Sequence, residues 1–477
     1  MIDDEAAVAE RERKQFVKMT QTSIPRLIIG LGIPTTLSMM VTSLYNLADT
    51  YFVSLLGDDA VTAAASNLLA LMSIIQAIGF TFGMGSGSII SRLLGKRDRE
   101  GADKVFSSSL FVSCVCGVLI LLFGFIFFTP MLRLLGSKAS DVLFYSKQYA
   151  RYILIAAPFM CMSFVLNNVL RAEGKAVLSM IGLIVGAVVN VVLDPVLIFA
   201  AGMGITGAAI ATCASQILSF VILLFMFLSG KTIVRFRLRS ISRKFDVYKD
   251  VITTGFPSFC RQVLASLCTV FLNSAAFDCG VAHYGTEDGG KAAQAALGVV
   301  QKVFMLAFST SLGIGQGYQP VLGYNYSAKH FDRVKSAYLF TLFFSMCVMA
   351  VFAIFCGIGA PLVMKMFSLS KEATEIGALA LRLQCICMPL LPLNFMASVT
   401  YQSVGSKAIA ALLSVSRQGL FYIPAVLTLP KLLGLIGVQS CQALSDLFAF
   451  FFAIPFTIMF LNTVKKEQKK VNEGGEE

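Results

Sequence analysis

Residues 177–201 read VLSMIGLIVGAVVNVVLDPVLIFAA, an apolar run that contains a single charged residue, Asp194. About 20 apolar residues in an α-helix are enough to cross the ~30 Å hydrocarbon core of a bilayer. Eleven further runs of this kind are separated by connectors that contain glycine, proline or charged residues. They cover residues 27–55, 62–92, 106–132, 145–170, 208–228, 251–276, 293–322, 336–366, 379–404, 409–429 and 436–461.

The composition of the whole chain supports the same class of protein. Hydrophobic residues make up 56% of the chain and charged residues 14%, and the mean hydropathy is +0.77, whereas soluble globular proteins have roughly 45–50% apolar and ~25% charged residues. A soluble enzyme, a disordered chain and a fibrous repeat are thereby excluded. The net charge of +12 lies in short connectors, so a nucleic-acid partner is not expected. We predict an all-α integral membrane protein with twelve transmembrane helices.

The distribution of lysine and arginine predicts the orientation in the membrane. If both termini lie inside, the inner segments carry 27 of the 39 lysines and arginines, and the outer connectors carry 8. Cytoplasmic loops of membrane proteins are enriched in these residues. We therefore expect a multi-pass protein with both termini in the cytoplasm.

The chain also contains an internal repeat. Gly32-Ile33-Pro34 recurs as Gly255-Phe256-Pro257, and the glycines at 83, 85 and 87 recur at 313, 315 and 317. Each half holds six spans, an even number, so the halves are predicted to be parallel repeats around a central cavity. The predicted units are a cytoplasmic tail (1–26), an N-lobe (27–230), a basic cytoplasmic linker (231–250), a C-lobe (251–461) and a second cytoplasmic tail (462–477).

Two carboxylates in the N-terminal half are the strongest candidates for function, because ionisable groups within a bilayer are costly. Asp49 lies near the outer part of the first span, and Asp194 lies four residues after Asn190, so these two side chains share a helical face. Thr212 in the sixth span can add a hydroxyl. This oxygen set suits a hard cation or a transferable proton. The alternative is that Asp49 is interfacial and that Asp194 only caps a break before Pro195.

Four basic residues also lie within predicted spans, and glutamines stand beside or near them. The basic residues are Arg261, Lys302, Arg382 and Arg417, and the glutamines are Gln262, Gln301, Gln384 and Gln418. These groups can hold the two halves together or bind anionic groups, and the structural role is favoured. Asp446 in the last span is the most obvious counter-ion. Pro34, in the first third of the first span, predicts a bend, either as a moving hinge or as part of the fold geometry.

Several motifs together resemble one known family, the multidrug and toxic compound extrusion (MATE) family. They are Tyr45-Asn46-x-x-Asp49, Asn190-x-x-x-Asp194-Pro195, the stretch QGYQPVLGYNY at 316–326 and Ser416-Arg417-Gln418. The resemblance covers essentially the whole chain and is greatest to the bacterial branch with DinF-type and MepA-type exporters, in the architecture of the MOP superfamily.

The resemblance implies a two-lobe exporter in a bacterial inner membrane that exchanges amphipathic organic cations for Na⁺ or H⁺ by alternating access. It also implies a cation site, a metal site if the ion is Na⁺, at Asp49, Asn190, Asp194 and Thr212, and a bend in the first span at Pro34. Leu272 and Ile423 stand at the repeat positions of Asp49 and Asp194, so a second ion site in the C-lobe is not expected. No cofactor is expected, and we expect a monomer. Substrate or inter-lobe contacts are expected from Asn46, Arg261, Gln262, Lys302 and Arg417.

Two other functions remain open from the sequence. A flippase for a lipid-linked oligosaccharide would use Arg261, Lys302 and Arg417 to bind a pyrophosphate. An integral-membrane enzyme or receptor would need a catalytic constellation or a large extracytoplasmic domain, and the sequence contains no recognisable example of either. An enzyme is therefore not predicted.

Overall fold

The structure is a computed structural model that describes residues 2–56, 59–137, 139–367 and 370–473. Within these ranges the side chains of residues 2–7, 46, 47, 50, 54 and 59 are not described. The described residues form helices joined by short connectors, without a β-strand among them. This arrangement confirms the predicted all-α class.

The predicted number of membrane spans is also confirmed, because twelve helices in the described part of the chain are long and apolar enough to cross a membrane. Spans 5, 10 and 11 each contain a π- or 3₁₀-helical segment. In chain order the spans are α2 (Ile24–Ser54), α3 (Asp59–Gly95), α4 (Arg99–Ile126), α6 (Ser140–Ala172), α7 (Ala176–Pro195) with η1 (Val196–Ala200), α8 (Gly204–Leu228), α9 (Phe245–Tyr284), α10 (Glu287–Ser327), α11 (Phe331–Ile358), α13 (Lys371–Cys387) with η3 (Met388–Leu390) and α14 (Leu391–Val404), α15 (Lys407–Val415) with η4 (Ser416–Tyr422) and α16 (Ile423–Leu433), and α17 (Leu435–Glu473).

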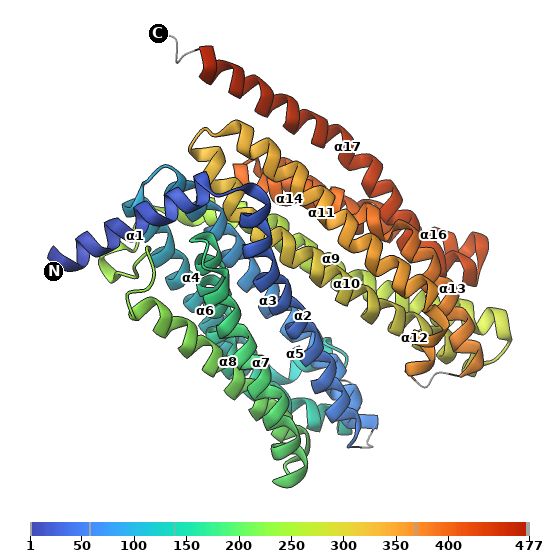
Figure 1. The fold of residues 1–477 in the computed structure, drawn as a ribbon. Coiled ribbons are helices and arrows are strands. Elements are labelled where there is room, and N and C mark those ends of the chain that lie inside the picture. Colours follow the sequence, from blue (N-terminus) through green and yellow to red (C-terminus); the bar gives the residue numbers. More distant parts are fainter. Residues whose placement is uncertain (1, 57–58, 138, 368–369, 474–477) are drawn as a thin grey trace.

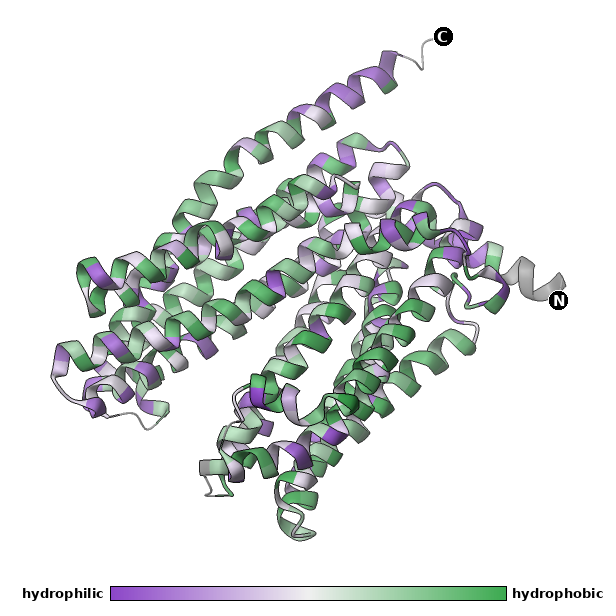
Figure 2. Cartoon of the chain, turned by 180° about the vertical axis from the view of Figure 1, so that it is seen from behind, coloured by the Kyte–Doolittle hydropathy of each residue, from purple (hydrophilic) through white to green (hydrophobic). Residues whose placement is uncertain are grey.

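Helical structure extends beyond the apolar runs that predict the spans. The N-terminal segment forms α1 (Ile2–Gln21), and α17 continues through the polar sequence up to Glu473. Short helices α5 (Phe128–Leu134) and α12 (Ala360–Met366) follow the third span of each half, and η2 (Leu238–Ser240) lies in the linker. Hydropathy predicts the part of a helix that lies in lipid, and polar helical extensions outside the lipid lack this signal. Figure 2 shows hydrophobic residues along most of the helices and hydrophilic residues gathered near the two termini.

The helices form two bundles, which contain α2–α8 and α9–α17 and are called the N-lobe and the C-lobe below. The lobes pack against each other mainly through two helix pairs, α2 with α10 and α3 with α9. The repeat interchanges these pairs, because α9 is the counterpart of α2 and α10 that of α3. Figure 1 shows the two bundles converging on the side that carries both termini and diverging toward the opposite side. We call the contact that these two helix pairs make between the lobes the seam.

Glycines make the close approach at the seam possible. A Cβ on Gly317 of α10 would lie 2.6 Å from the Cα of Gly32 on α2, a distance that real Cβ atoms essentially never show. A Cβ on Gly255 of α9 would collide with the backbone of Thr81 on α3. Two hydrogen bonds between α2 and α10 complete the contact, from Thr35 Oγ1 to the carbonyl of Gly313 (2.6 Å) and between the hydroxyls of Ser43 and Ser309 (2.7 Å).

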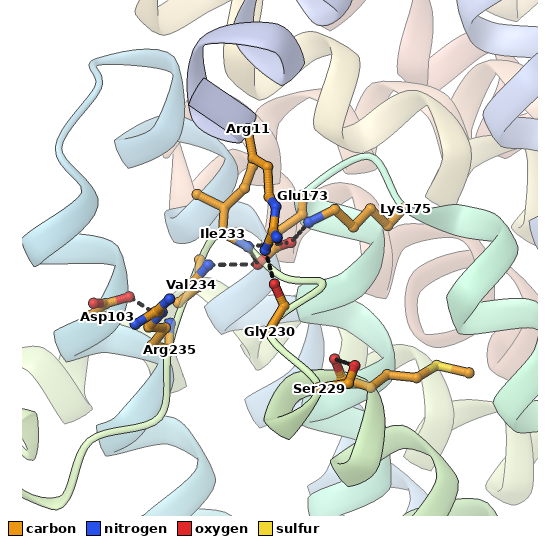
Figure 3. Close-up of polar contacts among 10 residues, drawn as sticks. Arg11, Asp103, Glu173, Lys175, Ser229, Gly230, Ile233, Val234 and Arg235 are labelled. Carbon is orange, nitrogen blue, oxygen red and sulfur yellow. Dashed lines mark hydrogen bonds and ion pairs between the residues drawn. The ribbon is translucent and has the colours of Figure 1, made fainter. Parts of the chain in front are cut away.

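The first part of the linker between the lobes is fixed to the N-lobe (Figure 3). The buried Glu173 carboxylate accepts hydrogen bonds from the backbone amides of Ile233 (3.0 and 3.1 Å) and Val234 (2.8 Å), and it forms an ion pair with Lys175 (2.5 Å). The carboxylate of Asp103 on α4 accepts a hydrogen bond from the next amide, that of Arg235 (2.7 Å). The linker therefore belongs structurally to the N-lobe up to this point, before α9 begins.

Candidate ion and substrate sites

Four side chains that the sequence singles out in the N-lobe come from three helices. Asn190 and Asp194 lie on consecutive turns of α7, and the Asn190 amide Nδ2 is 3.4 Å from both Asp194 Oδ1 and Thr212 Oγ1 of α8. Asp194 is fully buried. Asp49 lies on α2, where the hydroxyl of Tyr149 on α6 donates to its Oδ2 at 3.4 Å. These hydrogen bonds are long compared with the usual ~2.9 Å, so they hold the four side chains together only weakly.

The local fold at the end of α7 follows from Pro195. Proline has no backbone N–H to donate within a helix, and here a π-helical turn, η1, begins directly after it. The regular α-helical hydrogen bonding ends at this point, so the side chain of Asp194 lies at the junction between the α-helix and the π-helical turn. Wide turns of this kind occur often at functional sites.

Two tyrosines lie near the carboxylates of α2 and α7. Tyr45 and Tyr149 each experience the electrostatic field of both Asp49 and Asp194, and the Tyr45 hydroxyl accepts a hydrogen bond from Gln216 Nε2 at 3.4 Å. The two acids thus share one polar environment within the N-lobe. Tyr45 stands one helical turn before Asp49 and was visible in the motif, whereas no spacing in the sequence connects Tyr149 or Gln216 with the acids.

Three oxygens in this N-lobe acid cluster (Asp49, Asn190, Asp194 and Thr212) are buried and lack a hydrogen-bond partner within the described part of the chain. They are Asp49 Oδ1, Asn190 Oδ1 and Asp194 Oδ2. Unpaired buried acceptors are unfavourable unless a proton or cation satisfies them. Carboxylate, amide and hydroxyl oxygens are ligands for hard cations, and the described residues contain no group of three or more His, Cys, Asp and Glu suited to a metal. The side chain of Asn46 lies outside the described residues.

Three of the four predicted basic residues and all four glutamines of the C-terminal half line one cavity, whose described lining belongs to the C-lobe except for Phe80 of α3. Its volume is about 490 Å³. Arg261 and Gln262 come from α9, Lys302 from α10, and Arg417 from η4. No Asp or Glu is among the described residues that line it. Arg382 is exposed on α13 and does not belong to this lining.

Arg417 is held within the C-lobe. Its Nε donates to Asp446 Oδ1 at 2.6 Å, and its guanidinium lies 5.0 and 5.5 Å from the ring centres of Phe304 and Phe308. Arg261 also makes its contacts within this lobe, since it donates to Ser258 at 3.3 Å and its guanidinium lies 5.3 Å from the ring centre of Phe395. The hydrogen bonds that connect α2 with α10 come from the hydroxyl groups at the seam instead.

Pro34 lies inside a helix that continues on both sides of it. The α2 helix runs from Ile24 to Ser54, and the hydroxyl of Ser38 donates to the backbone carbonyl of Pro34 (2.8 Å). The missing backbone donor of Pro34 leaves the carbonyl of Gly30, four residues earlier, without its usual helical partner. A hinge at Pro34 is therefore compatible with a continuous helix in this conformation.

The duplicated lobes, the twelve spans and the buried polar sites define a multi-pass membrane transporter, not an enzyme. The MatE family model matches the chain twice, at residues 34–196 and 263–427, and the chain belongs to this family. The resemblance to MATE transporters found in the sequence is thereby confirmed.

Similar proteins include the multidrug export protein MepA of Staphylococcus aureus (strain MSSA476), which is 24% identical over 89% of this chain and 91% of its own length. A solved structure of a multidrug resistance MATE family transporter in an outward-facing conformation has a TM-score of 0.87 and 28% identity over 94% of this chain and 98% of its own. A MOP superfamily transporter from Pyrococcus furiosus, described as having a binding pocket of reverse polarity, has a TM-score of 0.86 and 28% identity over the same shares.

Proposed function

We propose that this protein is a secondary active antiporter that exports amphipathic organic cations in exchange for Na⁺ or H⁺. The observation that carries the proposal is the set of three buried, unpartnered oxygens in the N-lobe acid cluster. Membership of the MatE family and similarity to a protein named as a multidrug exporter support the substrate class. We further propose a monomer in a bacterial inner membrane with both termini in the cytoplasm.

The structure suggests how ion binding can act on the whole transporter. Asp49 lies on α2, and the same helix forms half of the seam through Gly32 and Thr35. Two carboxylates in a medium of low dielectric repel each other when both are charged. A bound cation or proton removes this repulsion and favours a closer approach of α2 to α7, on which α2 packs. Because α2 is shared, the same movement alters the seam, which is the two-state element that alternating access requires.

The conformation described here corresponds, in this proposal, to an outward-open state. The lobes converge on the side that carries the termini and diverge on the other side (Figure 1). With the termini in the cytoplasm, the seam closes the inner side and the diverging ends face outward.

Dye transport in proteoliposomes tests the proposal. Full-length protein is reconstituted, Na⁺ and H⁺ gradients are imposed separately, and export of rhodamine 123 is followed. We expect one of the gradients to drive export and Asp194→Asn to abolish it, because the neutral amide cannot exchange a charge. The matched control is Asp141→Asn, an exposed acid at the start of α6, which should export as the wild type does. Undiminished gradient-driven export by Asp194→Asn would refute the assigned role.

One observation also favours the flippase alternative, namely the three basic residues around the C-lobe cavity. A flippase for a pyrophosphate-linked lipid would not export rhodamine 123 under either gradient and would lose lipid transport when Lys302 or Arg417 is neutralised. The dye experiment therefore separates the two functions.

A further inference from the structure

The C-lobe cavity carries positive charge that the protein itself only partly neutralises. Lys302 forms neither an ion pair nor a hydrogen bond with the described residues, and the buried Nη1 of Arg261 lacks a hydrogen-bond partner. Arg417 is more than nine-tenths buried and is paired with Asp446 through Nε, yet its Nη2 also lacks a partner. Three cations thus face one acid, and that acid is not part of the described lining.

An uncompensated guanidinium in a buried site is energetically unfavourable. Buried charges in proteins are normally paired, and removing one partner of such a pair is strongly destabilising. An anionic group in the cavity would supply the partner that Arg261 and Lys302 lack in the described structure. An organic cation in the same place would be repelled by all three basic residues.

The amide groups around the cavity provide further donors. Gln262, Gln301 and Gln418 belong to the lining, and Gln301 donates its Nε2 to the hydroxyl of Thr269 at 2.7 Å. An amide side chain carries two N–H donors, so Gln301 can offer its second hydrogen to a ligand. Donors of this kind beside arginine and lysine are suited to carboxylate, sulfonate or phosphate oxygens.

The remaining walls are apolar and aromatic. Phe304 and Phe308 stack near Arg417, and Leu272, Met305 and Leu312 complete this side of the cavity. A cavity of about 490 Å³ falls in the range of ~300–1,000 Å³ that is usual for drug-sized ligands. The site combines an acidic-group receptor with a non-polar pocket for the rest of the molecule.

We infer that the C-lobe cavity binds an amphipathic organic anion, with its acidic group at Arg261, Lys302 and Arg417 and its non-polar part against the phenylalanines. This inference rests on the proposed exporter function and extends its substrates from organic cations to organic anions. The organic cations would then bind in the N-lobe, near its acid cluster. The acidic group can belong to a soluble compound or to the headgroup of an anionic lipid, which share the same chemistry.

A binding measurement on two dyes of opposite charge tests the inference. Fluorescein methyl ester is an anion and rhodamine 123 is a cation on the same xanthene methyl benzoate skeleton. Fluorescence polarisation is recorded for each dye with the purified full-length protein in an uncharged detergent. We expect the anion to bind and rhodamine 123 not to displace it, because the three basic residues of the cavity repel a cation.

Substitutions at the exposed lysine identify the site. Lys302→Gln should weaken binding of fluorescein methyl ester by about tenfold, and Lys302→Arg should restore most of the affinity. Arg261→Gln gives a second measurement at another helix and should weaken binding similarly. The control Arg382→Gln removes a cation of the same lobe outside the cavity and should leave the affinity unchanged. Displacement of the anion by rhodamine 123, or wild-type affinity for the anion in Lys302→Gln, would overturn the inference.

Lipid competition identifies the source of the acidic group. Displacement of the anionic dye by phosphatidylglycerol but not by phosphatidylcholine assigns the cavity to an anionic lipid headgroup, and absence of displacement assigns it to a soluble organic anion. The binding measurement needs no ion gradient. A failure of gradient-driven export would therefore contradict the proposed antiport and leave the dye-binding result intact. Wild-type affinity for the anion in Lys302→Gln would contradict only the inference about the cavity.

Discussion

Substitution of Gly317 by alanine should open the seam. Gly317 lies on α10 and faces the backbone of α2, where its absent side chain allows contact between the lobes. An alanine Cβ would lie 2.6 Å from the Cα of Gly32, 2.7 Å from its nitrogen and 2.8 Å from the carbonyl carbon of Leu31. All three atoms belong to the backbone, so no side-chain rotation can relieve the collision.

The size of the effect follows from these distances. Ordinary van der Waals contact for a Cβ begins at 3.4 Å, so α10 and α2 must separate by about 0.8 Å at this point, and overpacking of this kind costs about 1–3 kcal/mol. Alanine also has a higher helix propensity than glycine by about 1 kcal/mol, but that gain is present in both conformations and cancels. The population with an open seam should therefore rise by about 5- to 150-fold relative to the closed one.

Electron paramagnetic resonance can measure this population directly. Spin labels are attached to unnatural amino acids at Leu134 and Met366, because the chain contains 12 native cysteines. Both positions are exposed, at 88% and 76%, and they lie at the ends of α5 and α12, on the diverging side of the two lobes (Figure 1). As the seam opens in Gly317→Ala, these ends should approach and a shorter distance should gain population.

Gly30→Ala provides the matched control for Gly317→Ala. Gly30 is also a helical glycine near the seam, but an added Cβ would find no atom within 4 Å. It should keep the distance distribution of the wild type and gain slightly in thermal stability through helix propensity. If Gly317→Ala also keeps the wild-type distribution, the seam does not depend on the absence of a Cβ at this position, and the steric argument is wrong.

Two further predictions concern buried charges outside the seam. Glu173→Gln should lower the free energy of unfolding in detergent by about 1.5–3 kcal/mol, because the charge-assisted contacts with Lys175 and the linker amides are weakened. Thermal melting checks this, and an unchanged melting temperature would show that Glu173 does not hold the linker. Asp446→Ala should destabilise the protein by about 3–5 kcal/mol, because Arg417 is left buried without its counter-ion. The double variant with Arg417→Met should regain most of that loss in the same melting assay, and a double variant as unstable as Asp446→Ala would contradict the pairing argument.

Hydropathy and the repeat predict most of this fold, because a membrane span requires about 20 apolar residues regardless of its neighbours. The ends of the helices are a different matter. The α17 helix continues to Glu473 through polar residues whose sequence resembles an exposed tail. The linker segment at Ile233 and Val234 reads as a simple basic connector, and only its contact with Glu173 from a distant helix shows that it is fixed to the N-lobe.

The candidate sites were predictable to the extent that they are local in sequence. Asn190 and Asp194 are four residues apart, so helical periodicity alone places them on one face, and the structure brings their side chains within 3.4 Å. Tyr149 reaches Asp49 from another helix, and no periodicity can reveal such a contact. The same holds for Arg261, Lys302 and Arg417, which come from three different elements and share one cavity only after the C-lobe has folded.

The two halves of the duplicated chain have diverged in the sign of their buried charge. Leu272 and Ile423 stand in the C-lobe at the repeat positions of Asp49 and Asp194, and Val188 stands in the N-lobe at the position of Arg417. A scaffold that binds a cation and an organic anion in separate lobes avoids placing both charges in one low-dielectric site, where their attraction would resist release. The sites remain connected because α2 carries Asp49 and contacts α10, the helix that carries Lys302. In the proposed antiport, the sequence difference between the two lobes thus gives the ion and the substrate separate binding sites. The seam couples the two binding events mechanically.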